Sequence, residues 1–282
     1  MSELRLQPVR IAAVGDLHIR TTAPDDLAEE LSLLNGQIDL MVVAGDITDG
    51  GRVPEVEAAA EVLSVIHAPM IGVLGNHDRR GLRRTLMRKT LERGGLELLD
   101  GHADMLTLPD GRTIGFAGIS GTGGGFRLDE DEAAIGGRIR QVVAVKARRE
   151  AQRLKDALQE LHDPQPDVTI AVTHFAPTVS TLGDEPVVKY WMLGNSLLGQ
   201  VIDEDGRVDL AIHGHAHLGS RIGETPGGVP VRNVALPVTG GIVIFEVGPD
   251  REVRAINTVP GPHDDRNSET VRFRMLDLLR NE

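Results

Sequence analysis

Side chains that can bind a metal ion or move a proton follow five separate apolar runs of the sequence. They are Asp16, His18, Asp46, Asp49, Asn76, His77, His174, His213, His215 and His217. Carboxylate and amide oxygens with imidazole nitrogens suit Mn, Fe, Zn, Co or Ni, and suit Cu(I) or an iron–sulfur cluster poorly. The set is too large for one open catalytic ion. It fits two ions that share a bridging carboxylate, an arrangement used for in-line displacement at phosphorus.

These side chains need buried strands to position them. The apolar runs 9–14, 40–44, 70–74, 168–172 and 208–212 are each predicted to be a strand that ends directly before one polar cluster. Helical patterns at 24–34 and 54–66 follow the first two runs, which indicates parallel βαβ units. Because the carboxyl ends of parallel strands share one edge of a sheet, the clusters are expected to meet there.

The remaining segments predict an α/β domain with additions. A hairpin is expected at 104–119, since Pro109-Asp110-Gly111-Arg112 separates two strand-like runs. A charged helical insert is expected over 131–161, and closing antiparallel strands over 231–236, 241–247 and 252–258. We expect a catalytic domain over 1–260 and a C-terminal helical tail over 261–282, with oligomerisation left open.

Composition restricts the class of protein. The 282 residues carry a formal net charge of −12, which argues against a main task of coating nucleic acid or an anionic membrane. The absence of cysteine excludes disulfides, thiolate metal sites and thiol nucleophiles. Neither a signal-peptide pattern nor an apolar run of spanning length is seen, so we expect a cytoplasmic protein.

The polar clusters together resemble the calcineurin-like metallophosphoesterases. That family's pattern is D-x-H, G-D-x-x-D, G-N-H-D/E, a lone His and G-H-x-H. The sequence has all five blocks in order: Asp16-Leu17-His18, Gly45-Asp46-Ile47-Thr48-Asp49, Gly75-Asn76-His77-Asp78, His174 and Gly214-His215-Ala216-His217. The first and third blocks are closer to the small phosphodiesterase branch. Gly50-Gly51 after Asp49 lacks the Asp-Arg-Gly continuation of protein Ser/Thr phosphatases.

The resemblance implies a four-layer α/β/β/α sandwich with two facing mixed sheets and a dinuclear centre of Mn, Fe or Zn. It assigns Asp16, His18 and His217 to the first metal and Asn76, His174 and His215 to the second, with Asp46 bridging them. A bridging hydroxide would attack phosphorus, His77 would protonate the leaving group, and Asp49 would orient His77. The implied substrate is a small phosphate ester, most of all a phosphodiester.

Some interpretations stay open at this stage. Arg79 and Arg80 follow the catalytic block closely enough to contact a phosphate, although a solvated helix face also explains them. Asp78 is expected to cap the basic helix that follows, and His213 to pack rather than bind metal. A phosphomonoesterase, a nuclease and, from a different class, a metal-binding interaction scaffold remain alternatives. Nucleic acid is not favoured as a partner.

Overall fold

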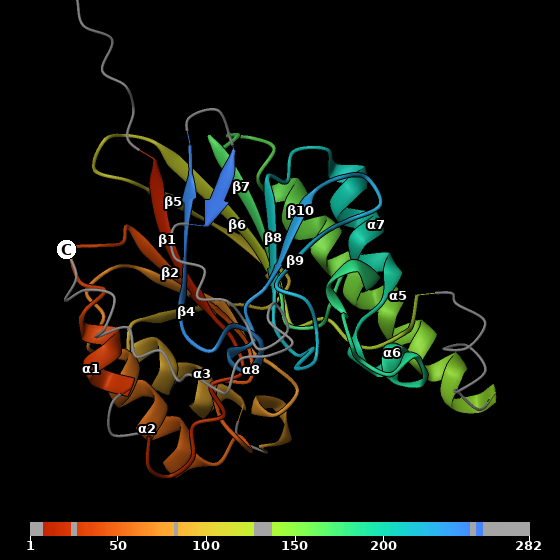
Figure 1. Cartoon of the computed structure of the whole chain (residues 1–282), viewed down its shortest axis with the longest axis horizontal. Helices are drawn as coiled ribbons and strands as arrows, with labels where there is room; N and C mark the ends of the chain where they lie inside the picture. Colours follow the sequence, from red (N-terminus) through yellow and green to blue (C-terminus); the bar gives the residue numbers. More distant parts are fainter. Residues whose placement is uncertain (1–7, 24–26, 82–83, 127–136, 249–251, 256–282) are drawn as a thin grey trace, which may run out of the picture.

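The computed structural model describes residues 8–23, 27–81, 84–126, 137–248 and 252–255, and two sheets form its centre (Figure 1). The first sheet has the order β12-β11-β1-β2-β3-β4. Strands β1 to β4 are parallel, and β11 and β12 add to it in antiparallel fashion. Its strands are β1 (Val9–Val14), β2 (Leu40–Ala44), β3 (Met70–Val73), β4 (Leu96–Leu99), β11 (Val243–Val247) and β12 (Val253–Ala255).

The second sheet has the order β5-β6-β7-β8-β10-β9. Its central strands β6, β7, β8 and β10 are parallel, and β5 and β9 form antiparallel edges. Its strands are β5 (His102–Thr107), β6 (Thr113–Ile119), β7 (Val168–Thr173), β8 (Leu210–His213), β9 (Ile222–Glu224) and β10 (Pro230–Asn233).

Helices cover the outer face of each sheet, which produces four layers (Figure 1). The first sheet is covered by α1 (Leu27–Ser32), α2 (Val53–Leu63) and α3 (Arg84–Arg93), and the second by α5 (Gly137–Glu160) and α7 (Ser196–Asp205). Short elements lie in the loops: α6 (Tyr190–Leu193), α8 (Leu236–Thr239), η1 (Asp78–Arg80), η2 (Val179–Thr181) and η3 (Val187–Lys189). No helix in the described ranges has the length and apolar character needed to cross a membrane.

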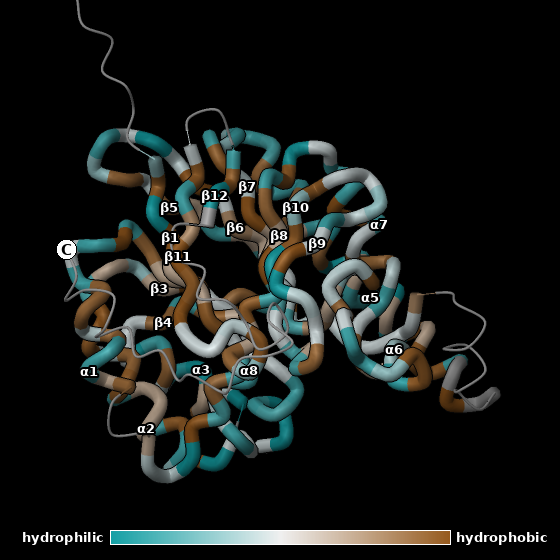
Figure 2. The backbone as a smooth tube through the Cα atoms, in the orientation of Figure 1, coloured by the Kyte–Doolittle hydropathy of each residue, from teal (hydrophilic) through white to brown (hydrophobic). Residues whose placement is uncertain are grey.

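Alternating side chains of the strands supply separate apolar cores. In β1, Ile11 and Ala13 pack between the two sheets, whereas Ala12 and Val14 pack beneath the helices of the first sheet. Both faces of β1, β2 and β7 are buried apart from Arg10, so most residues of these strands are apolar (Figure 2). This explains why the sequence shows continuous apolar runs rather than an alternating pattern.

The structure confirms the predicted four-layer α/β/β/α sandwich with two mixed sheets, and it corrects several details. Strand β10 is parallel to β8 rather than antiparallel, because β9 reverses the chain between them. Strands β4 and β9 were not predicted: β4 has a charged residue at its second position, and β9 has only three residues. The helical insert is seen over Gly137–Glu160, while residues 131–136 and the tail at 261–282 lie outside the described residues.

Candidate metal centre

Loops from both sheets meet at the carboxyl ends of β1, β2, β3, β7 and β8. Backbone hydrogen bonds hold the first two loops together, with Asp16 N donating to Gly45 O at 2.9 Å and His18 N donating to Asp46 O at 3.0 Å. His174 Nδ1 lies 2.9 Å from Ala44 O, which joins the loop of the second sheet to the first. The clusters that are far apart in sequence therefore share one edge of the fold, as expected for parallel strands.

Asp16, His18 and His217 form one group of potential metal ligands. Their ligand atoms lie within 4.8 Å of one another. His217 Nε2 is 2.8 Å from Asp16 Oδ1, and His18 Nε2 is 3.9 Å from the same oxygen. Burial disfavours the ionised form of Asp16, but the hydrogen bond from His217 and the charge of His174 outweigh it and lower the Asp16 pKa. Asp16 is therefore a buried carboxylate that stays ionised.

A second group contains Asp46, His174 and His215, together with Asp16. His174 Nε2 lies 3.4 Å from Asp46 Oδ1 and 2.9 Å from Asn76 Oδ1, so Asn76 belongs to the same group. His215 Nε2 is 3.1 Å from Met192 O, which leaves Nδ1 for a ligand. The structure thus brings together every residue that the resemblance assigns to the second ion.

The His174 ring is held in one orientation from both sides. It is fully buried, and Nδ1 donates to Ala44 O, which turns Nε2 toward Asp46 and Asn76. Burial would lower the pKa of His174, but the Asp46 carboxylate raises it to about 9. Burial also opposes ionisation of Asp46, yet His174 keeps the Asp46 pKa well below its usual range.

Four of these candidate ligands have a left-handed backbone: Asp16, His18, Asp46 and His215 have φ of 57°, 45°, 49° and 70°. Among the described residues they are the only non-glycine positions with positive φ. Such conformations are unfavourable for L residues and cluster at functional sites. The strain therefore coincides with the metal-ligating positions and lies nowhere else in the described chain.

The glycines of the motifs allow the ligands to approach the backbone closely. A Cβ on Gly75 would collide with Oδ1 of Asp46, and one on Gly45, where φ is +85°, would lie 2.6 Å from His174 Nδ1. Neither position has room for a larger residue without moving a ligand. The Gly that precedes Asp46 and the Gly that precedes Asn76 are thus required by geometry.

His77 lies beside the two ligand groups and contacts backbone as well as side chains. Its Nδ1 is 2.7 Å from the backbone oxygen of Asp49, and its Nε2 is 2.9 Å from Nη2 of Arg80. The Asp49 carboxylate is 4.0 Å from His77 Nδ1, beyond hydrogen-bond range. Asp49 therefore contacts His77 through its carbonyl, whereas the sequence suggested its carboxylate. That carboxylate lies 3.4 Å from Arg20 Nε instead.

Sequence comparison identifies the family. The family model for calcineurin-like phosphoesterases matches residues 9–219, which include all five motif blocks. The chain belongs to this family. It is a metallophosphoesterase, a hydrolase that acts on phosphoric ester bonds. No curated protein sequence matches the chain significantly.

Solved structures share the phosphoesterase fold at low sequence identity. Phosphopantetheinyl Hydrolase (PptH) from Mycobacterium tuberculosis is 17% identical, with a TM-score of 0.57 over 93% of this chain and 99% of that one. TT1561 of Thermus thermophilus is 14% identical, with a TM-score of 0.55 over 89% and 99%. GAP50, an anchor in the inner membrane complex of Plasmodium, is 14% identical, with a TM-score of 0.54 over 90% of each chain. These likenesses show the fold alone.

The donor set of this phosphoesterase fits divalent metal ions. Asp16 and Asp46 are buried carboxylates at the same place, and two such charges need cations nearby. His18 Nδ1 is also buried and has no hydrogen-bond partner. A third group, His18, Asp49 and His77, adjoins the first through His18. Oxygen and imidazole donors in the two groups that share Asp16 are consistent with the dinuclear centre typical of the family.

Asp78 has a different place from the one predicted. It is fully buried, and its carboxylate accepts from Ile47 N, Thr48 N and Gly75 N at 3.2, 2.8 and 2.9 Å, and from Thr48 Oγ1 at 2.8 Å. It therefore joins the loops that carry Asp46 and Asn76 and does not cap the basic helix. No pattern in the sequence separates this role from capping, because both need an Asp after a loop.

His213 and Arg79 also have defined places. His213 is fully buried, with Nδ1 2.7 Å from Gly214 O and Nε2 2.8 Å from Thr181 Oγ1, so both ring nitrogens are already engaged. Arg79 Nη2 pairs with Asp100 Oδ1 at 3.0 Å at the border of a pocket that also contains Asn76. His213 packs without serving as a ligand, as its position in the sequence suggested.

Replacing Asp78 is expected to destabilise the protein. In Asp78→Ala, three buried amide N–H groups lose their acceptor, and each unsatisfied group costs about 1–3 kcal/mol. We expect urea denaturation to show a loss of about 3 kcal/mol in the free energy of unfolding. Asp104→Ala, an exposed aspartate on the edge strand β5, is the control and should change stability by less than about 0.5 kcal/mol. Equal stability of the two variants would refute the assignment.

Metal binding should stabilise the folded protein. Protein treated with a chelator and then titrated with Mn²⁺ is expected to bind about two ions per chain. At a hundred times the dissociation constant, native-state binding adds about 2.7 kcal/mol per site to stability, which raises the Tm. Asp46→Asn should lose most of this rise, since Asp46 contacts His174 and lies 3.8 Å from His18 Nε2. Asp104→Asn should retain it, and a site that refuses Mn²⁺ would contradict the prediction.

Proposed function

We propose that this phosphoesterase hydrolyses small phosphodiesters and that His77 protonates the departing alkoxide. The observation that carries the proposal is the position of His77 beside both ligand groups, with Nε2 4.0 Å from Asp46 Oδ2 and the side chain partly exposed. A general acid must come within hydrogen-bond reach of the leaving oxygen, and a phosphate held at the ligand groups would lie beside His77.

The contacts of His77 prepare it for this task. Nδ1–H donates to the Asp49 carbonyl, so the ring orientation is fixed and Nε2 is the nitrogen that faces the substrate. His77 N also donates to Asp46 Oδ1 at 2.8 Å, which fixes the backbone of the acid relative to the ligands. Arg80 reaches Nε2 in this structure, and we propose that it moves to a phosphate oxygen when substrate binds.

The proposed ligands divide as the motifs suggest. Two divalent or mixed-valence ions, of Mn, Fe or Zn, would be held by Asp16, His18, Asp46, Asn76, His174, His215 and His217, and they supply an activated water and positive charge at phosphorus. The Asn76 amide and Arg79 would orient the non-reacting phosphate oxygens.

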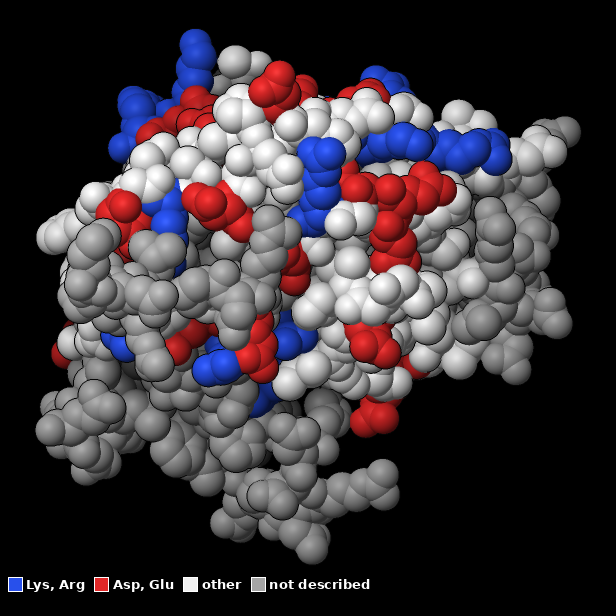
Figure 3. Space-filling view, turned by 90° about the horizontal axis from the view of Figure 1, so that it is seen from above, with Lys and Arg blue, Asp and Glu red and all other residues white. Residues whose placement is uncertain are grey.

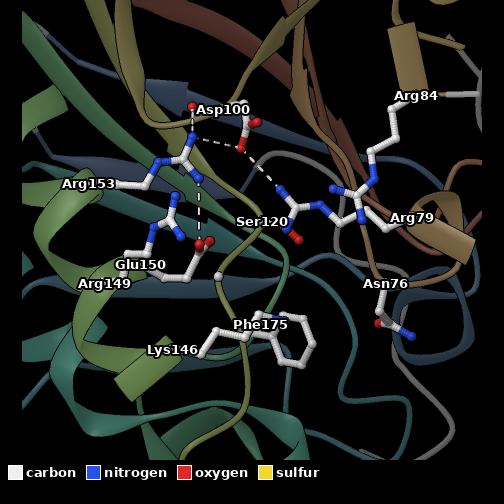
Figure 4. Close-up of a pocket in the computed structure, with 11 residues that line it drawn as sticks. Asn76, Arg79, Arg84, Asp100, Ser120, Lys146, Arg149, Glu150, Arg153 and Phe175 are labelled. Carbon is white, nitrogen blue, oxygen red and sulfur yellow. Dashed lines mark hydrogen bonds and ion pairs between the residues drawn. The ribbon is translucent and has the colours of Figure 1, made fainter. Parts of the chain in front are cut away.

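Space beside Asn76 supports a diester substrate. A pocket of about 550 Å³ begins at Asn76 and extends toward α5 (Figure 4). This volume lies in the range of small-molecule sites and exceeds what the phosphate alone requires. The second ester arm of a diester can occupy it, whereas a phosphomonoester has only one arm to place.

An interaction scaffold of the same fold is the alternative from another class, since GAP50 is described as an anchor. The strained backbone of Asp16, His18, Asp46 and His215 argues against it here. Such conformations cost of order 1–3 kcal/mol each, and a protein that serves only as a scaffold gains nothing from them. Hydrolysis of a phosphate ester by the Mn²⁺-loaded protein separates the two functions, because a metal-binding scaffold would bind the ion without turnover.

The proposed role of His77 as proton donor can be tested by comparing the hydrolysis rates of esters whose leaving groups differ. In His77→Asn, hydrolysis of an alkyl phosphodiester with Mn²⁺ should fall by about 10²–10⁴-fold, because the alkoxide has no proton donor. Hydrolysis of bis(p-nitrophenyl) phosphate should fall far less, since p-nitrophenolate leaves without a proton. The measurement is kcat/KM for both esters, with p-nitrophenyl phosphate as the monoester comparison.

His67→Asn, at an exposed histidine that precedes β3 whereas His77 follows it, is the matched control and should leave both rates unchanged. Equal losses on the alkyl and aryl esters in His77→Asn would show that His77 supports the site without donating the proton. A clear preference for the monoester would overturn the diester substrate while leaving the family activity in place.

A further inference from the structure

The pocket beside Asn76 is strongly basic, although the chain as a whole is acidic. Its lining has five cationic side chains, Arg79, Arg84, Lys146, Arg149 and Arg153, against the carboxylates of Asp100 and Glu150. The formal net charge of the protein is −12, and on the face shown in Figure 3 basic and acidic side chains are interspersed. The pocket is therefore a local concentration of positive charge.

Three of the five cations have no carboxylate partner among the described residues. Arg84 lies on α3, and Lys146 and Arg149 lie on α5, and none of them has an ion pair within the described part of the chain. α3 belongs to the helical layer of the first sheet and α5 to that of the second. Unpaired charges of one sign from two layers repel one another, and an anionic ligand between them removes that repulsion.

The other two cations are fixed in place. Asp100, in the turn between β4 and β5, lies 3.0 Å from Arg79 Nη2 and 3.1 Å from Arg153 Nη2 (Figure 4). Arg153 Nη1 also lies 3.5 Å from Glu150 Oε1. These contacts connect η1, the β4–β5 turn and α5, so the floor of the pocket is already ordered without a ligand.

Two buried polar atoms in the lining have no hydrogen-bond partner in the described structure. They are Oγ of Ser120, which is 1% exposed, and Oε2 of Glu150, which is 5% exposed. A buried polar group without a partner is costly, and such groups in a pocket point to a ligand or ordered water. Ser120 follows β6 directly and can donate to an anion, while Glu150 can accept from a hydroxyl group.

We propose that this pocket binds a second phosphate group, carried on one ester arm of the substrate. Asn76 belongs both to the pocket and to the metal-ligand group, so a molecule with one phosphate at the metal centre extends directly into the basic pocket. The substrate class is a small phosphodiester with a further phosphate, such as a nucleotide ester with a second phosphorylated hydroxyl. This inference rests on the proposed phosphodiesterase function and adds a specificity determinant to it.

A solvated helix face is the simplest alternative for the charges of α5, and the positions argue against it. Lys146, Arg149, Glu150 and Arg153 have the spacing that places them on one side of the helix, and all four line the pocket. Arg148 is exposed on the same helix but does not line the pocket. It is therefore an internal control for a charge on α5.

The experiment compares two esters that differ only in the second phosphate. They are the p-nitrophenyl ester of thymidine 5′-phosphate and the same compound with a 3′-phosphate, each hydrolysed with Mn²⁺. The additional charge-assisted hydrogen bonds should raise kcat/KM at least about tenfold for the 3′-phosphorylated ester, with the gain falling as ionic strength increases. No gain at low ionic strength would overturn the proposal.

Substitutions in the pocket test whether the increase in kcat/KM for the 3′-phosphorylated ester arises there. Arg149→Gln and Lys146→Gln should each remove most of the advantage of the 3′-phosphate, measured as the ratio of kcat/KM for the 3′-phosphorylated ester to kcat/KM for the plain ester in the same variant. Arg148→Gln should retain the full advantage. If Arg148→Gln loses as much as Arg149→Gln, the effect is a diffuse one of net charge and the proposal fails.

A binding measurement separates the pocket from the reaction. Calorimetry on Mn²⁺-loaded protein should show tighter binding of thymidine 3′,5′-bisphosphate than of thymidine 5′-phosphate by about tenfold, and Arg149→Gln should abolish the difference. Selective binding without hydrolysis of either ester would refute the phosphodiesterase function and support the pocket. Hydrolysis of both esters at equal rates, with equal binding, would refute the pocket alone. A gain that continues to grow along longer oligonucleotides would overturn the small-molecule assignment in favour of a nucleic-acid strand.

Discussion

The contact between Asp46 and His174 connects the two halves of this phosphoesterase. Asp46 follows β2 of the first sheet and His174 follows β7 of the second, and both side chains are almost completely buried. Each stabilises the charged form of the other against the effect of burial. Because the contact crosses between the sheets, the distance between the sheets and the geometry of the ligands are determined together. A change in either affects both ligand groups.

The energetically unfavourable features of the fold are concentrated in the loops at the edge that carries the metal ligands. Four left-handed backbones, two glycines that tolerate no Cβ and a buried Asp78 all occur within the loops that carry the ligands. The central strands are regular and bury apolar side chains on both faces, and this burial compensates for the strained loops. A ligand set held in place in this way needs little rearrangement when cations bind, which favours tight binding.

Much of the architecture could be predicted from the sequence, because its signals are local. A run such as 40–44 is apolar on both faces and ends in Gly-Asp, so both the strand and its polar end are visible in one short segment. The order of the calcineurin-like motifs then predicted which loops, distant in sequence, hold the same metal ion. Short strands such as β4, with four residues, and the parallel direction of β10 depend on contacts between segments, for which single-sequence patterns contain little information.

The candidate site shows the same division. The residues that converge at the strand ends were predictable by type and spacing, but the partners of individual atoms were not. Asp49 contacts His77 through a backbone oxygen, and any residue type at that position could supply it. Asp78 accepts only one side-chain hydrogen bond, and its other partners are amides. The basic pocket combines residues 79, 84 and 146–153, which no sequence window contains.

The place of β1 in the first sheet has a consequence for synthesis of the protein. β1 lies between β2 and β11, and Val9 pairs with Val247. A nascent chain on the ribosome therefore carries β1 with one edge unpaired until β11 has emerged. During that time an apolar strand edge is open to chaperones or to another nascent chain. The first sheet closes only after β11 has been synthesised.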